Sequence, residues 1–114
     1  MKDFQERDYI LNEMRTLLSI PSPSGLTKKA TDYLMQELKA LGFSPNKTVK
    51  GGVLVKICEG ENALMLSAHV DTLGAMVRTV KSNGRLRLTP IGGLQANNIE
   101  TENCIVFTRS GKQY

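Results

Sequence analysis

The amino-acid sequence predicts an α/β protein in which helices pack on a mixed sheet, followed by the first strands of a small β-barrel. Two stretches, residues 5–19 and 26–41, carry apolar side chains at helical spacing, and a short apolar run at 63–68 is typical of a buried strand. Segments with the residue pattern of β-strands, separated by turn-forming residues, follow. We therefore divide the chain into residues 1–72, the N-terminal part of an α/β domain, and residues 73–114, the beginning of a β-barrel domain.

Residues 5–19 are expected to form the first helix, because Ile10, Met14, Leu17 and Leu18 recur at i, i+4, i+7 and i+8. Asp3 is the expected N-terminal cap. The helix must end before the Pro-Ser-Pro-Ser-Gly segment at 21–25, since proline removes a backbone donor and biases the preceding residue to extended conformations. This loop could line a substrate cleft, but its turn chemistry favours a connector between two helices.

Residues 26–41 are expected to form the second helix. Ser24 is the expected cap, and Gly42 is the expected stop. The apolar residues share one face, and we expect this face to pack on the sheet that contains the strand at 63–68. The members of this face are Leu26, Ala30, Tyr33, Leu34, Leu38 and Leu41.

Three strands are predicted before residue 72. Residues 43–49 are interrupted by Pro45 and suit an edge strand, whereas residues 53–58 are rich in branched side chains. The run at 63–68 has no turn formers and no polar alternation. It is therefore predicted to be a central parallel strand covered on both faces.

The segment after Asp71 has the pattern of a meander of short strands. Its final turn lies just before the C-terminal Tyr114, where a partner strand should begin, and a closed barrel needs more strands than these. We therefore expect the barrel to be truncated. The predicted elements are a strand at 74–81, a hairpin turn at 82–84, a strand at 85–89 with one wet face, a loop at 90–93 and a strand at 103–108.

The composition, with 40% hydrophobic and 23% charged residues, is that of an ordinary globular protein. No apolar stretch reaches the ~20 residues that span a bilayer, and the N-terminus lacks a signal-peptide core, so no membrane association is expected. Cys58 and Cys104 match no metal or redox pattern and are expected to be small buried apolar residues. A cytoplasmic location follows as an expectation.

The formal net charge of +4 is unevenly spread. Residues 1–72 hold nine basic and nine acidic residues, whereas residues 73–114 hold six basic residues against Glu100 and Glu102. Basic residues never run longer than Lys28-Lys29 and are not interleaved with aromatic residues. We therefore expect no nucleic-acid partner and interpret the asymmetry as a segment boundary.

His69 and Asp71 follow the apolar run, where open α/β sheets bind their ligands. Residues i and i+2 of an extended chain point to the same side, so the two side chains should meet. A neutral imidazole is a common metal ligand, and a carboxylate on its other nitrogen fixes its tautomer. The two residues are thus candidates for a metal ligand and its partner, while a merely structural histidine is the plainer alternative for so short a motif.

A wider set of motifs accompanies this pair: Leu66-Ser67-Ala68-His69-Val70-Asp71-Thr72-Leu73-Gly74, Pro90-Ile91-Gly92-Gly93, Ser19-Ile20-Pro21-Ser22-Pro23-Ser24-Gly25 and Gly51-Gly52-Val53-Leu54. In this order and spacing the chain resembles the N-terminal portion of the glutamyl/deblocking aminopeptidase family. These enzymes are metallopeptidases with a dinuclear metal site that assemble into hollow tetrahedral particles.

The resemblance implies a zinc-peptidase-type catalytic domain interrupted by an inserted β-barrel. It implies a peptide substrate, two divalent ions (zinc or cobalt) and a homo-oligomer in the complete protein. It assigns His69 as a metal ligand and Asp71 as the catalytic carboxylate that supports it.

The sequence departs from a complete peptidase in its ligands. A two-metal site needs several carboxylates, a second histidine and a general base, but the chain contains one histidine. By the resemblance the remaining ligands lie downstream, so the chain is expected to be a fragment that is inactive alone.

Three alternatives stay open. The related carboxypeptidases, deacylases and dipeptidases also use a strand-end His-x-Asp motif. The chain could also be a non-catalytic truncated product, or a small basic β-rich binding module. A half-barrel with open strand edges would in any case tend to self-associate.

Overall fold

The computed structural model describes residues 2–114, with side chains from Glu6 onward. It divides into two units, Met1–Leu73 and Gly74–Tyr114. Each unit has its own secondary structure.

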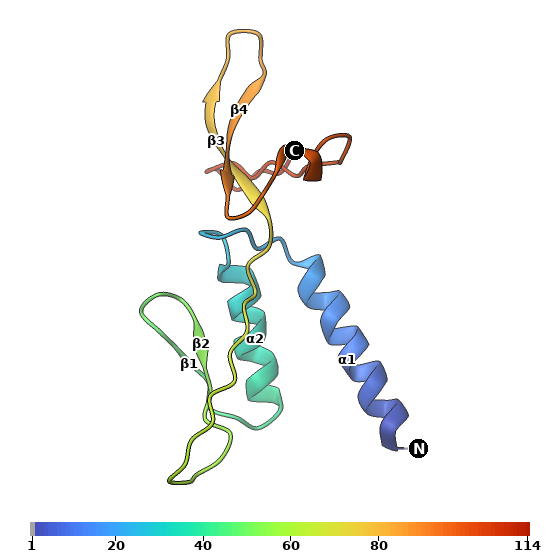
Figure 1. Ribbon diagram of the computed structural model, residues 1–114, viewed down its shortest axis with the longest axis vertical. Helices are drawn as coiled ribbons and strands as arrows, with labels where there is room; N and C mark the ends of the chain where they lie inside the picture. Colours follow the sequence, from blue (N-terminus) through green and yellow to red (C-terminus); the bar gives the residue numbers. More distant parts are fainter. Residues whose placement is uncertain (1) are drawn as a thin grey trace. The chain divides into compact units, whose positions relative to one another are not determined.

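The first unit begins with two antiparallel helices, α1 (Lys2–Ser19) and α2 (Lys28–Ala40), joined by the proline-containing loop (Figure 1). Both predicted helices are confirmed, and α1 starts earlier than predicted. The Tyr33 hydroxyl on α2 donates a hydrogen bond to Glu13 Oε2 on α1 over 2.8 Å. This acceptor, followed by desolvation, raises the pKa of Tyr33. The side chain of Asp3, the predicted cap of α1, lies outside the described side chains.

Only the C-terminal end of α2 agrees with the prediction from the sequence. Gly42 has φ +88° and donates its N–H to the Lys39 carbonyl over 2.9 Å, while the Phe43 N–H reaches the Leu38 carbonyl over 3.0 Å. This is the expected glycine-terminated helix end. At the other end the N-cap is Thr27, which makes no side-chain cap hydrogen bond. The prediction that Ser24 caps α2 is therefore wrong, because its hydroxyl is used elsewhere.

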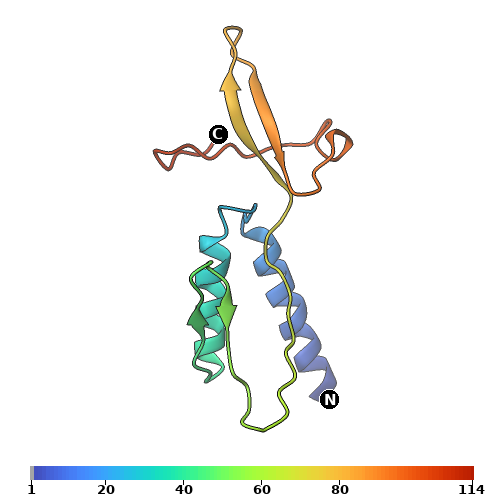
Figure 2. The same ribbon diagram turned by 60° about the vertical axis from the view of Figure 1, so that its left-hand side comes forward.

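A two-stranded antiparallel sheet lies beside α2 (Figure 2). It consists of β1 (Asn46–Lys47) and β2 (Val53–Leu54), both shorter than predicted. Asp32 on α2 accepts hydrogen bonds from Lys28 and Lys47, each over 2.5 Å, so one carboxylate joins the helix to β1. The two ammonium groups lower the pKa of Asp32.

The apolar run at 63–68 is extended but belongs to no sheet in the described chain, and Figures 1 and 2 draw it as a plain trace. Leu64, Met65 and Leu66 are between 80% and 86% exposed. The prediction of a buried central strand is wrong here, and α2 packs against β2 instead. A central strand needs hydrogen-bonded neighbours on both edges and cover on both faces, and these residues have neither.

The second unit is built on a hairpin of β3 (Gly74–Val80) and β4 (Leu86–Ile91). The predicted turn is confirmed: Gly84 has φ +79°, and Lys81 and Arg85 close the loop through a 2.8 Å backbone bond. β4 continues through Pro90 and Ile91, which were predicted to form a loop. This is possible because the strand lies at an edge, where proline costs no ladder bond.

Several sequence predictions for residues 85–108, and one for Cys58 of the first unit, are wrong. Leu86 and Leu88 on β4 are exposed, so the strand does not have one dry face. Residues 103–108 contain only an isolated antiparallel bridge, in which Phe107 pairs with Gln113. Cys104 here and Cys58 in the first unit are exposed free thiols, not buried residues. The described residues of this unit do not enclose a core that would cover these side chains.

The α/β class is thus confirmed at the level of two helices and small antiparallel sheets. The larger mixed sheet is not formed by the described residues, and the identity of the second unit as part of a β-barrel stays a prediction. Within residues 2–114 no helix combines the length and apolarity required to cross a bilayer.

Candidate metal-ligand site

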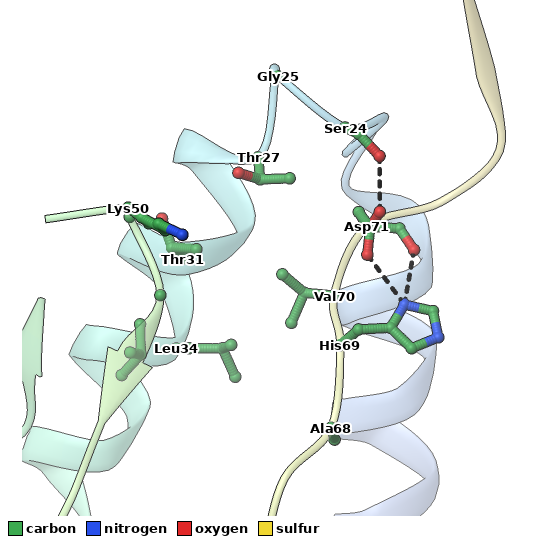
Figure 3. A pocket seen from close by; sticks show the side chains of 13 residues that line it. Ser24, Gly25, Thr27, Thr31, Leu34, Lys50, Ala68, His69, Val70 and Asp71 are labelled. Atoms are coloured by element: carbon green, nitrogen blue, oxygen red, sulfur yellow. Dashed lines mark hydrogen bonds and ion pairs between the residues drawn. The ribbon is translucent and has the colours of Figure 1, made fainter. Parts of the chain in front are cut away.

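The segment 68–72 is extended, so successive side chains alternate between its two sides. Figure 3 shows Val70 directed toward Leu34 of α2, with His69 and Asp71 together on the opposite side. The pairing expected from the i, i+2 spacing is therefore present. It follows from the local backbone alone.

The imidazole of His69 contacts Asp71 through one nitrogen. Its Nδ1 lies 3.0 Å from Asp71 Oδ1 and 3.1 Å from the Asp71 backbone oxygen. A carboxylate and a carbonyl only accept hydrogen bonds, so Nδ1 must be the donor. The neutral ring then carries its lone pair on Nε2, which makes no hydrogen bond within the described residues. Because the side chain is 83% exposed, this lone pair is open to a ligand.

The carboxylate of Asp71 has a second partner that the sequence did not suggest. Ser24 donates its hydroxyl to Asp71 Oδ2 over 2.6 Å, across 47 positions of sequence (Figure 3). This hydrogen bond, followed by that from His69, lowers the pKa of Asp71. The carboxylate is therefore held in the charged form that accepts both bonds.

The proline-containing loop is fixed to the segment that carries the site. The Thr72 N–H donates to the Ser22 carbonyl over 2.9 Å, and Ser22 Oγ donates to the Val70 carbonyl over 2.7 Å. Pro23 and Thr72 form a parallel bridge. The loop connects two helices, as predicted, but it also holds the histidine-bearing segment. No local sequence signal could reveal this, since the partners are far apart in the chain.

An open pocket of about 320 Å³ lies next to the site. Its lining combines the loop, the first turns of α2, the turn before β2 and the segment 68–71, and includes Ser24, Thr31, Leu34, Val53 and His69. The lining is thus both apolar and polar. Residues of the loop therefore border this pocket, while the alternative that the loop lines a substrate cleft stays a prediction.

The donor groups among the described residues fit one ligand position of a metal site and not a complete site. His69 offers an exposed ring nitrogen with a carboxylate on its other side, which is the usual arrangement of a ligating histidine. Within the described residues, however, no group of three or more His, Cys, Asp or Glu side chains lies close enough to hold an ion.

We expect Ser22→Ala to lower the free energy of unfolding by about 1–3 kcal/mol, because it leaves the Val70 carbonyl without its donor. Ser22 is only 2% exposed, so water does not readily replace the hydroxyl. Urea unfolding followed by circular dichroism measures the change. Ser19→Ala is the matched control, since it removes an exposed serine bond to the Thr16 carbonyl. Equal midpoints for the two variants would contradict the role of Ser22.

Comparison with known protein families gives a match over the second half of the chain. The sequence profile of the M42 glutamyl aminopeptidases matches residues 51–114. The matched range contains His69 and Asp71.

Individual relatives match over most of the chain. YhfE of Bacillus subtilis, which bears the provisional name of an aminopeptidase, is 42% identical over 89% of the chain. The glutamyl aminopeptidase of Lactococcus lactis is 33% identical over 91% of the chain, and the lysyl aminopeptidase of Pyrococcus furiosus 26% over 89%. In each case the chain spans 30% of the relative's length. All three names denote aminopeptidases, and none denotes a carboxypeptidase or deacylase.

Proposed function

The chain belongs to the M42 glutamyl aminopeptidase family, and on this basis we propose that it forms part of a metal-dependent enzyme that removes N-terminal residues from peptides. The single observation that carries the proposal is the His69–Asp71 pair, with Nδ1 bonded to the carboxylate and Nε2 free on an exposed ring. The names of the relatives support the proposed substrate class.

In the proposed site His69 supplies one ligand through Nε2, and Asp71 orients the ring and raises its basicity. Two divalent ions, zinc or cobalt, would activate water and polarise the scissile carbonyl when bound. The other metal ligands and the general base would come from residues outside these 114. We also propose that the complete enzyme is a cytoplasmic homo-oligomer without nucleic-acid or membrane partners.

A chimaera tests this proposal. Residues 1–114 would replace the corresponding 30% of the B. subtilis relative. We expect the chimaera to hydrolyse a chromogenic aminoacyl substrate in the presence of zinc or cobalt, because the relative supplies the remaining ligands. The native relative is the positive control. A folded chimaera that binds metal but shows no turnover on a panel of aminoacyl substrates would contradict the proposed activity.

A second candidate, a non-catalytic product or basic binding module, is favoured by the lack of a three-ligand group within the described residues. For the chain alone we therefore expect no hydrolysis above background with either metal. Turnover by the isolated chain would show that it completes a site without further ligands. Its retention on heparin at physiological salt would instead favour the basic module.

A further inference from the structure

Ser24 makes a contact that its position in the sequence does not explain. Its only hydrogen bond within the described residues is the donation to Asp71 Oδ2 over 2.6 Å. It does not cap α2, whose N-cap is Thr27. The hydroxyl is therefore hydrogen-bonded to the carboxylate and not to the backbone of the adjacent helix.

The two oxygens of Asp71 are thereby divided between two partners. Oδ2 accepts from Ser24, and Oδ1 accepts from His69 Nδ1 over 3.0 Å (Figure 3). A distance of 2.6 Å is typical of an O–H···O⁻ bond to a charged acceptor. Two bonds to two different oxygens restrict the rotation of the carboxylate, which at 43% exposure would otherwise exchange partners with water.

The backbone places Ser24 independently of this contact. The loop is held on the segment 70–72 by the Thr72-to-Ser22 and Ser22-to-Val70 hydrogen bonds. Proline at 21 and 23 restricts φ on either side of Ser22. Little additional ordering is then required for Ser24 to reach Asp71, and the hydroxyl arrives already directed at the carboxylate.

We propose that Ser24 is a positioning residue for His69, acting through Asp71: it holds the carboxylate so that the imidazole keeps its proton on Nδ1 and presents the Nε2 lone pair. The inference that this arrangement assists metal ligation rests on the proposed function. The inference about the tautomer does not rest on it, because the tautomer can be measured without any metal.

His69 is the only histidine in the sequence, so its imidazole signals need no assignment by mutation. We would record long-range ¹H–¹⁵N correlations of the ¹⁵N-labelled 114-residue chain, free of metal, at about pH 8.5, where an ordinary histidine is neutral. The wild-type chain is expected to show the Nδ1–H tautomer as the dominant form. Ser24→Ala is expected to shift the population to a mixture in which Nε2–H is prominent.

Two further variants separate positioning from a general effect on the fold. Ser24→Thr keeps the hydroxyl and should restore the Nδ1–H form. Ser67→Ala makes the same change at an exposed serine two residues before His69 and should leave the tautomer unchanged. An unbiased tautomer mixture in the wild-type chain, or no shift in Ser24→Ala, overturns the inference. A folded, metal-binding chimaera without turnover would overturn the proposed function and leave the tautomer result unaffected.

Discussion

His69→Ala is expected to abolish binding of the metal ion that His69 is proposed to ligate. It should also lower the activity of the chimaera at least about 100-fold. The methyl group has no lone pair to replace Nε2, and the loss should exceed the 10–100-fold cost of removing a partner outside the ligand shell. Within the described residues no group of three or more His, Cys, Asp or Glu side chains lies close enough to hold an ion in its place. Elemental analysis of the purified chimaera measures the number of bound ions directly.

Gln36→Ala is the matched control for this variant, because it truncates an exposed polar side chain on α2 that does not line the pocket next to the site. It should keep the metal content and activity of the parent chimaera. Two ions retained in a folded His69→Ala chimaera would refute the assignment of His69 as a ligand. Circular dichroism of both variants establishes that the comparison is between folded proteins.

Asp71→Asn is expected to weaken metal affinity or activity of the chimaera by about 10–100-fold without preventing folding. The amide keeps the size of the side chain but loses the negative charge that orients the ring and raises its basicity. It also presents an N–H₂ group to either Ser24 or His69, so one of the two present hydrogen bonds must be rearranged. Zinc titration against a chromophoric chelator measures the affinity.

The control is the same change at Asp32, a carboxylate that also has a lowered pKa and two hydrogen-bonded partners. Its partners are lysines of α2 and β1, so Asp32→Asn should leave metal affinity unchanged. Equal affinity losses for the two asparagine variants would indicate a general electrostatic effect. In that case the specific role of Asp71 would have to be abandoned.

The features that the sequence predicted correctly depend on nearby residues. The end of α2 at Gly42 and the turn at Gly84 each require a positive φ, which glycine adopts without steric cost. The hydrogen bond between His69 and Asp71 follows from the alternation of side chains on an extended segment. These outcomes are encoded within a few positions of the chain.

The features that the sequence predicted wrongly depend on what surrounds a residue. The apolar run at 63–68 has the composition of a central strand, yet Leu64 and Leu66 are exposed because no described segment pairs with it or covers it. Cys58 and Cys104 are exposed for the same reason. The composition shows which side chains favour burial, but a side chain is buried only where another segment covers it.

By itself the sequence determined the class of the fold, the two helices, the β3–β4 turn and the pairing of His69 with Asp71. Only the tertiary structure decided that Ser24 belongs to this pair, since its hydroxyl meets a carboxylate 47 positions away. A local pattern reports the conformations of neighbouring residues. A hydrogen bond between distant segments exists only after the backbone bonds of Ser22 and Thr72 have brought those segments together.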